Sequence, residues 1–386
     1  MKRKPFLPAA SAFLLMIAMS SLSTALSFFV TPVCEELGFG RGSFSFYTSL
    51  ITATGAVSAS YLANYMSSRG TRGVVLLSSL WCGLGFWGMS MAYSLWTFYI
   101  LGTAMGFLGG TCLYLASNAI VQQCYEPKDV STMWGIVMAG CGIGGVLWSN
   151  VMPISISSFG WRASYKVLAL LWFALAGGSV LLLKNPRNTD SIGNPKSTDT
   201  GGSKKEIFTN PKFYLTAAAH IIFTAGSCIG GQLPAILGGM GYESEYVGLM
   251  ISVMTASGAV GTIVEGVMCT KIGIQKTMNA MMILYIAGFL LLWLNMLPYI
   301  ALVFLAFGSG ISGTLMPVMV RVVFGGRVYA AVWSYMIVVS SISGFVSNPL
   351  WGMVYDVFGT YAPALVLMPV MIFGSMFAVR ASFQEK

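Results

Sequence analysis

The polar stretch KNPRNTDSIGNPKSTDTGGSKKEIFTNPK, residues 184–212, decides how this chain is organised, because it interrupts a sequence that is apolar almost everywhere else. It is rich in Pro, Gly, Ser, Thr and Lys, a composition typical of a flexible linker. On either side of it, long apolar runs follow one another, separated by short breaks that carry polar residues, Gly or Pro. We therefore expect a helical membrane protein in which this linker joins two halves.

The composition excludes a soluble globular protein. Of 386 residues, 56% are hydrophobic and 9% are charged, whereas a soluble chain carries roughly 25% charged residues. The net charge of +9 comes from basic residues dispersed singly between apolar runs, so it predicts no nucleic-acid-binding face. The seven cysteines show no C-x-x-C spacing, and we expect neither disulfides nor a metal site.

Apolar runs of the length that a membrane crossing needs, about 20 residues, occur six times before the linker and six times after it. They predict transmembrane helices at residues 9–33, 44–66, 74–93, 96–121, 131–154, 163–183, 213–237, 246–269, 277–296, 299–321, 329–352 and 361–380. The expected fold class is an all-α membrane protein of twelve transmembrane helices in two pseudo-symmetric six-helix bundles. Residues 1–183 would form the N-terminal bundle, 184–212 a cytoplasmic linker and 213–386 the C-terminal bundle.

The basic residues predict the orientation of these helices, because Lys and Arg concentrate on the cytoplasmic side of a membrane protein. With the amino terminus placed in the cytoplasm, all but three of the 21 Lys and Arg residues fall on the cytoplasmic side. The exceptions are Arg41, Arg162 and Lys166. We therefore expect a multi-pass protein of the cell (inner) membrane with both termini and the linker in the cytoplasm.

Two pairs of loop sequences indicate an internal repeat. The loop SSRGTR around Gly70 matches TKIGIQK around Gly273, 203 residues later. The loop FGWR around Gly160 matches FGTY around Gly359, 199 residues later. Two pairs at nearly one offset favour a duplicated bundle, and in transporters built from repeats the solute site lies between the repeats.

At these residues the sequence resembles the major facilitator superfamily, whose loop between helices 2 and 3 normally reads G-x-x-x-D-R-x-G-R-R. Arg69, Gly70 and Arg72 match that pattern, whereas Ala63 replaces the leading Gly and Ser67 replaces the acid. In the second half the matching residues are Gly266, Lys271, Gly273 and Lys276, with Thr270 at the acid position. The resemblance implies the major facilitator fold and secondary transport. It also implies a cytoplasmic gating loop made of Ser67, Arg69, Gly70, Arg72, Thr270, Lys271 and Gly273.

Two further segments resemble the monocarboxylate and oxalate/formate-type carriers of that superfamily. They are EELGFGRGSFS at residues 35–45 and NPLWGMVYDVFGTY at residues 348–361; both also fit generic loop signals. Proton-driven drug exporters of the superfamily usually carry an Arg in helix 4 and a Gly-Pro pair in helix 5. This chain has Gly102 at the first position and GCGIGG at residues 140–145 without that Pro. Both absences disfavour a proton-driven drug exporter.

Ionisable side chains inside a bilayer are costly and mark functional sites. The candidates are His220 and Glu265, with Arg321 at the cytoplasmic end of its helix. A rise of about 1.5 Å per residue places His220 roughly 10 Å and Glu265 roughly 8 Å into the membrane. We hypothesise that the two lie close enough to couple their protonation. The alternatives are a hydrogen-bonded packing histidine for His220 and, for Glu265, a cytoplasmic-side gate or an interfacial carboxylate paired with Lys271 or Arg327.

The monocarboxylate-like carriers generally place a basic residue in helix 8, but residues 247–268 contain no Lys, Arg or His. A small anion would then be held by hydroxyl, amide and indole donors, which suit a neutral or amphipathic solute equally well. The candidate donors are Tyr114, Asn118, Asn150, Gln232, Trp333, Tyr335 and Asn348.

The chain lacks H-E-x-x-H and P-loop motifs, and we expect a transporter rather than an enzyme, with no cofactor and no metal. The predicted function is secondary active transport of a small organic solute, a carboxylate in the first place, by alternating access with proton coupling or exchange. The alternatives are efflux of hydrophobic drug-like compounds and a solute sensor that does not transport. The expected partners are the solute, protons and the lipid bilayer, with no nucleic acid and a monomeric state.

Overall fold

The computed structural model describes residues 6–125, 127–182, 204–325 and 328–384. The first half contains α1 (Phe6–Ser20), α2 (Thr24–Ser27), α3 (Val30–Leu37), α4 (Arg41–Arg69), α5 (Thr71–Met89), α6 (Leu95–Leu108), α7 (Gly110–Cys124), α8 (Pro127–Trp172), the π-helix η1 (Phe173–Gly177) and α9 (Gly178–Leu182). The predicted linker lies largely outside the described residues, but its end includes α10 (Lys204–Thr209).

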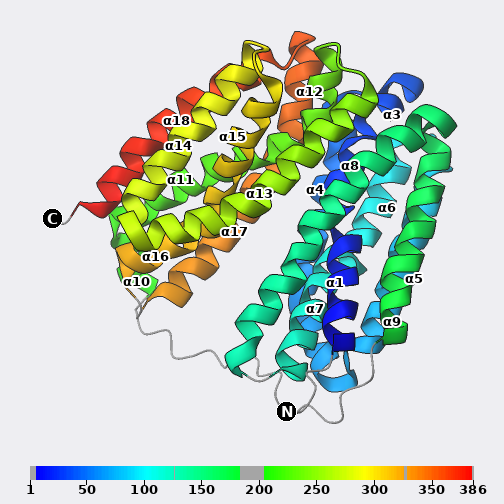
Figure 1. Ribbon diagram of the computed structural model, residues 1–386, viewed down its shortest axis with the longest axis horizontal. Coiled ribbons are helices and arrows are strands. Elements are labelled where there is room, and N and C mark those ends of the chain that lie inside the picture. The colour runs from blue at the N-terminus through cyan, green and yellow to red at the C-terminus, as the bar shows by residue number, and fades with distance from the viewer. Residues whose placement is uncertain (1–5, 126, 183–203, 326–327, 385–386) are drawn as a thin grey trace. The chain divides into compact units, whose positions relative to one another are not determined.

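The second half repeats this pattern of long helices with short interruptions (Figure 1). Its elements are α11 (Pro211–Cys228), the 3-10 helix η2 (Ile229–Gln232), α12 (Leu233–Gly239), α13 (Ser244–Ile272), α14 (Ile274–Trp293), α15 (Pro298–Gly310), the π-helix η3 (Ile311–Leu315), α16 (Met316–Phe324), α17 (Tyr329–Phe358) and α18 (Ala362–Phe383).

Within the described residues, nine helical segments are long and apolar enough to cross a membrane. One of them, Met133–Leu182, has 50 residues, enough for two crossings at about 20 residues each. Gly160, with φ 77° and ψ 165°, interrupts the helix between these two crossings. With α4 and α5, which carry more Ser, Thr and Gly, the described segments match all twelve predicted spans and confirm the all-α membrane fold.

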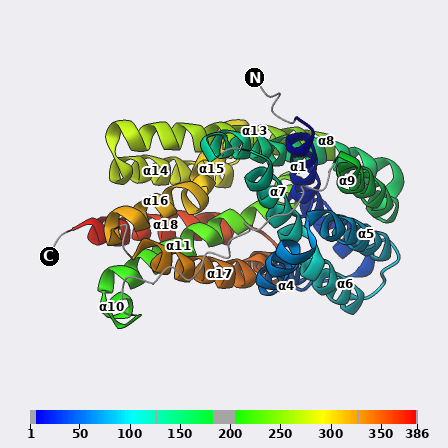
Figure 2. The same ribbon diagram turned by 90° about the horizontal axis from the view of Figure 1, so that it is seen from below.

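The chain divides into two compact units. Unit 1 contains α1 to α9 and the segment Glu243–Ser252, which includes the beginning of α13, and unit 2 contains α10 to α12, the rest of α13 and α14 to α18. In unit 1, α1 packs on α8 and α4 packs on α6. In unit 2, α11 packs on α17, and α14 lies beside α15 and α18 (Figures 1 and 2).

The first helix of each unit is broken, which the hydropathy of residues 9–33 and 213–237 did not predict. In the first half, Ser20 and Ser21 donate to the backbone carbonyls of Ile17 and Ala18, three residues earlier, at 2.8 and 2.7 Å. Such side-chain bonds compete with the helical ladder and bend helices. In the second half, the break is the 3-10 helix η2, which contains the pair Gly230 and Gly231, and Gly weakens a helix.

In each unit, a buried tryptophan donates a hydrogen bond to the broken helix. The indole N–H of Trp148 in α8 donates to the carbonyl oxygen of Ile17 at 2.9 Å. In unit 2, the indole N–H of Trp351 in α17 donates to the carbonyl oxygen of Ala225 at 2.8 Å. Both tryptophans are buried, and they lie 203 residues apart. The duplicated bundles therefore share a side-chain contact as well as a loop.

The two predicted glycine pairs have positive φ angles. Gly70 (φ 83°, ψ 164°) and Gly273 (φ 84°, ψ 159°) have nearly identical conformations, each at the junction of two helices. Gly160 and Gly359 differ, since their ψ angles are 165° and 5°. The first pair therefore repeats the backbone geometry, and the second repeats only the sign of φ.

Candidate functional site

Glu265 is a carboxylate enclosed in unit 2. It lies on α13 and is fully buried. Neither carboxylate oxygen has a hydrogen-bond partner among the described residues. Thr314 lies close enough to interact with the carboxylate, but without the geometry of a hydrogen bond. Because burying an unpaired charge is costly, this carboxylate needs a proton or a bound cation.

A glycine and a π-helix surround Glu265. A Cβ atom added to Gly310, the last residue of α15, would meet the carboxylate, so only Gly allows this close approach. The π-helix η3 begins at the next residue. π-helical turns inside α-helices are rare and frequently mark functional sites. The wide turn at residues 311–315 therefore faces the one buried acid of the described part of unit 2.

His220 is also buried in unit 2, but beside a different helix. Its ring lies 5.8 Å from that of Trp333 on α17, measured between centroids. Its Nδ1 atom has no hydrogen-bond partner among the described residues. Among those residues, no hydrogen bond or ion pair joins His220 to Glu265, so the hypothesis that they couple stays a prediction.

Hydroxyl groups that sequence reasoning did not single out lie between the helices of unit 2. The hydroxyls of Thr224 on α11 and Ser312 on η3 are 3.1 Å apart. Ser227 donates to the carbonyl oxygen of Ser309 at 3.4 Å. His220, Thr224 and Ser227 are spaced by four and three residues, which places them on one face of α11. That spacing is the signal in the sequence that would have found these hydroxyls.

The other candidate donors of unit 2 have separate neighbours. Gln232 is buried and accepts a hydrogen bond from Tyr361 at 3.0 Å. The ring of Tyr335 packs on Phe208 at 5.0 Å. Asn348 is half-buried on α17, and Arg321 is exposed in the last turn of α16. These side chains do not form one cluster with Glu265 through any hydrogen bond seen among the described residues.

Three candidate donors lie in unit 1. Tyr114 packs edge-on against Trp134, with centroids 5.4 Å apart. Asn118 accepts a hydrogen bond from Gln122 one turn along α7. Asn150 donates to the carbonyl oxygen of Val146 at 2.7 Å and to Ser252 at 2.7 Å. All three are at least partly accessible.

The predicted gating loops are described mainly by their backbone. Ser67 and Arg69 lie in the last turn of α4, and their side chains are outside the described part of the structure. Arg72 and Lys271 are exposed. Thr270 donates to the carbonyl oxygen of Val267 at 2.8 Å, so its hydroxyl bonds to its own helix.

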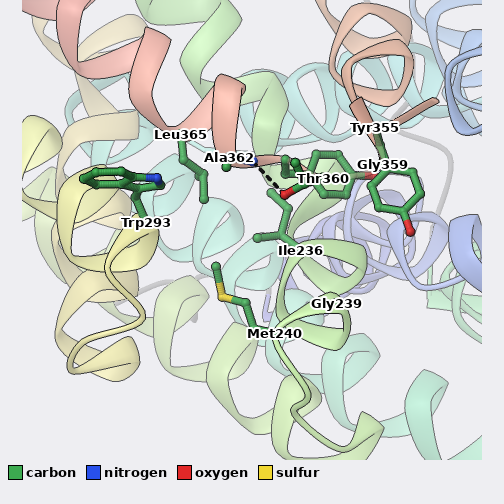
Figure 3. Close-up of a pocket in the computed structure, with 10 residues that line it drawn as sticks. Ile236, Gly239, Met240, Trp293, Tyr355, Gly359, Thr360, Ala362 and Leu365 are labelled. Carbon is green, nitrogen blue, oxygen red and sulfur yellow. Dashed lines mark hydrogen bonds between the residues drawn. The ribbon is translucent and has the colours of Figure 1, made fainter. Parts of the chain in front are cut away.

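A pocket of about 230 Å³ lies within unit 2, at the ends of α12, α14 and α17 and the beginning of α18. Trp293 and Tyr355 stand at opposite sides of it, with Ile236 between them (Figure 3). We call it the α12–α18 pocket; its lining residues are Ile236, Gly239, Met240, Trp293, Tyr355, Gly359, Thr360, Tyr361, Ala362 and Leu365. No sequence motif predicted it.

Two related bundles of membrane-crossing helices, one of them enclosing a carboxylate, an imidazole and several hydroxyls, define a membrane transport protein. The chain belongs to the Major Facilitator Superfamily, whose family model matches residues 9–347. Membership confirms the resemblance at the level of the superfamily. The monocarboxylate and oxalate/formate-type branch stays a prediction.

Similar proteins are distant in sequence. The agnestins efflux protein AgnL12 of Paecilomyces divaricatus is 22% identical over 340 residues, which are 84% of this chain and 75% of that protein. The nucleoside transporter NupG has a similar structure, with a TM-score of 0.79, 14% identity and 100% of both chains covered. A bacterial homolog of the human lysosomal transporter Spinster, inward-facing and unoccupied, has a TM-score of 0.71 at 16% identity, covering 99% of this chain and 94% of that one. At such identities the structural likeness shows the fold alone.

Proposed function

We propose that this protein is a secondary transporter that moves a small organic solute by alternating access in exchange for protons, with Glu265 as the residue that carries the proton. The observation that supports this proposal is the buried carboxylate whose two oxygens have no partner among the described residues. A carboxylate that gains and loses a proton changes its charge inside the bundle. Since a buried charge is costly, the ionised carboxylate favours a conformation in which this part of α13 is exposed to water. The protonated, neutral form favours one in which it is buried.

For the solute, the same carboxylate favours a neutral or amphipathic compound, exported from the cell. An anionic solute bound near Glu265 would be repelled whenever the carboxylate is ionised. No Lys or Arg lies at residues 247–268 of α13 to compensate. The name of the similar fungal efflux protein agrees with export. The carboxylate solute expected from the loop sequences is the second candidate.

Proton movement into proteoliposomes tests the function. Purified protein is reconstituted into vesicles loaded with a pH-sensitive dye, and a monocarboxylate, a neutral sugar or an amphipathic dye is added outside. We expect transport of the amphipathic compound to be accompanied by movement of protons in the direction opposite to that of the compound. Movement with the monocarboxylate alone would instead favour the second candidate. A sensor that does not transport would move no solute but would be stabilised by its ligand.

Glu265→Gln tests the role of the carboxylate in the same vesicles. The amide keeps the size of the side chain but cannot carry the proton. We expect the variant to exchange labelled solute for unlabelled solute while losing the coupled proton movement. Glu245→Gln is the matched control, because Glu245 is exposed in the first turn of the same helix. Equal proton movement in wild type and Glu265→Gln would overturn the assignment.

We also propose the orientation that the basic residues predict, with both termini in the cytoplasm of a cell whose inner membrane holds the protein as a monomer. The three cations predicted to lie outside each have a local partner. Arg41 lies 4.0 Å from Glu35, and Arg162 lies 3.3 Å from Glu36. The ammonium of Lys166 lies 5.8 Å from the ring of Trp87. Labelling of single cysteines added beside Arg162 and beside Arg321 from each side of the membrane tests the orientation.

A further inference from the structure

Arg162 occupies a well-defined site in unit 1. Its guanidinium donates to Glu36 at 3.3 Å and to the carbonyl oxygens of Ser90 and Ala92 at 3.2 and 3.0 Å. It also lies 4.2 Å from the ring centroids of Tyr93 and Trp161. Carbonyl oxygens just past the C-terminus of a helix, here α5, carry partial negative charge and attract cations. We call this arrangement the Arg162 site.

The repeat places the α12–α18 pocket of unit 2 at the position that corresponds to the Arg162 site. Trp161 donates to Glu36 at 2.7 Å, and Tyr361 donates to Gln232 at 3.0 Å, each bonding to the first broken helix of its own unit. Trp161 and Tyr361 are 200 residues apart. The loop pair FGWR and FGTY, at an offset of 199 residues, aligns Arg162 with Tyr361, and the 200-residue offset aligns it with Ala362; both residues line the pocket.

Unit 2 lacks a counterpart of Glu36, the acid of the Arg162 site, just as it lacks a counterpart of Arg162. Gly38 (φ 69°) and Gly241 (φ 92°), 203 residues apart, follow the ends of α3 and α12. At that offset Glu36 corresponds to Gly239, which also lines the pocket. Unit 2 thus has open space of about 230 Å³ where unit 1 holds a guanidinium and a carboxylate.

The electrostatic field of the pocket still favours a cation. Three helices, α12, α14 and α17, end at the pocket, and only α18 begins there. Helix C-termini carry partial negative charge. The carbonyl oxygens of Trp293 and Asn295 correspond to those of Ser90 and Ala92 at the 203-residue offset, and no donor among the described residues bonds to them.

Aromatic rings complete the resemblance to the Arg162 site. Trp293, Tyr355 and Tyr361 line the pocket, and the two tyrosine rings lie 5.0 Å apart between centroids. The faces of Trp and Tyr rings attract organic cations, as in the aromatic sites that bind quaternary ammonium groups. We propose that the α12–α18 pocket binds the cationic head of a small organic molecule, a guanidinium or quaternary ammonium group, where unit 1 holds its own Arg162.

Tetramethylammonium chloride and methylguanidinium chloride are the probes for this site. Saturation-transfer NMR on purified wild-type protein in detergent measures contact between the methyl protons of each probe and the protein, with sodium acetate as the reference compound. We expect transfer to both cations and not to acetate. No transfer to either cation would overturn the proposal.

Two variants locate the binding. Ala362→Arg places a guanidinium in the pocket, as in unit 1, and should weaken binding of both cations at least about tenfold, or 1.4 kcal/mol. Trp293→Leu removes the ring and should weaken it by about the same factor. Trp96→Leu is the matched control, because Trp96 is a strongly exposed tryptophan of unit 1 and its loss should change nothing. Unchanged binding in Ala362→Arg would overturn the assignment to this pocket.

Stability measurements separate pocket filling from misfolding. Ala362→Arg should change the melting temperature little, because it can gain carbonyl and ring contacts like those of Arg162 but has no carboxylate corresponding to Glu36. Arg162→Ala should lower it, and methylguanidinium should restore part of the loss, since it fits the emptied site. A destabilised Ala362→Arg protein would contradict the correspondence between the two sites. These readouts use no transport, so they fail or succeed independently of the proposed function.

Discussion

The buried carboxylate of Glu265 on α13 packs directly against Gly310 at the end of α15, in space that a Cβ atom would occupy. This contact joins an ionisable side chain to the residue before the π-helix η3. A change of charge on Glu265 is therefore felt by α15 and η3 without any intervening side chain.

Gly310→Ala should destabilise the protein by about 1 to 3 kcal/mol, the usual cost of forcing extra volume into a packed interior. Gly313→Ala is the control, because a Cβ there would meet nothing within 4 Å. Thermal unfolding in detergent measures both. Adding Glu265→Ala to Gly310→Ala should recover much of the loss, since it removes the group that the new methyl meets. A Gly310→Ala protein as stable as Gly313→Ala would contradict the contact.

Gly70→Ala and Gly273→Ala should each destabilise the protein by about 1 to 3 kcal/mol, because positive φ combined with ψ near 160° is a backbone conformation that essentially only Gly adopts. Their φ angles are 83° and 84°, and neither position lacks space. The cost is therefore conformational and should be nearly equal at the two sites. Gly73→Ala, in helix α5 with open space around it, is the control and should be neutral or stabilising. Unequal losses of stability at Gly70 and Gly273 would show that the two sites differ energetically although their backbone angles are nearly the same.

Hydropathy and basic residues were sufficient to predict the twelve spans. The loop sequences around Gly70 and Gly273 predicted a repeat that the backbone reproduces to within a few degrees. Counting residues also predicted the depth of His220 and Glu265 in the membrane, which stays a prediction. Depth follows from the rise per residue, but the direction of a side chain depends on how the helix is rotated and which helices surround it. The sequence therefore did not reveal that His220 faces Trp333 and Glu265 faces Gly310.

Arg162 illustrates the same limit. By charge alone it was an exception to the orientation of the other basic residues. Its contacts with Glu36, Ser90 and Ala92 come from two segments that are distant from it in the sequence. Only the packing of the bundle brings these segments together, so the role of this cation and the corresponding pocket in unit 2 could not be read from the residues around it.

Trp148→Phe and Trp351→Phe should each cost about 1 kcal/mol, the typical net value of one hydrogen bond, plus the loss of packing of a larger ring. The two indoles donate to the carbonyl oxygens of Ile17 and Ala225. Those acceptors lie in the last turns of α1 and α11, next to the helix breaks, and the carbonyl of Ile17 keeps its hydrogen bond from Ser20. Trp96→Phe, at a strongly exposed position, should change the melting temperature little. Equal effects at all three positions would contradict the role of the two buried indoles.

The contact between His220 and Trp333 can be measured by a double-mutant cycle. Their centroids are 5.8 Å apart with an angle of 46° between the rings, and aromatic pairs of this kind contribute about 0.5 to 1.5 kcal/mol beyond burial. We expect His220→Ala and Trp333→Leu to show that coupling in the free energy of unfolding. His220→Ala and Tyr335→Leu should be additive, because Tyr335 packs instead on Phe208, and residues without shared contacts do not couple.

The same cycle between His220→Ala and Glu265→Gln, followed through the pH dependence of transport, tests the predicted proton coupling. Additive effects there, together with coupling to Trp333, would assign His220 to the packing of α11 against α17 and leave proton transfer to Glu265.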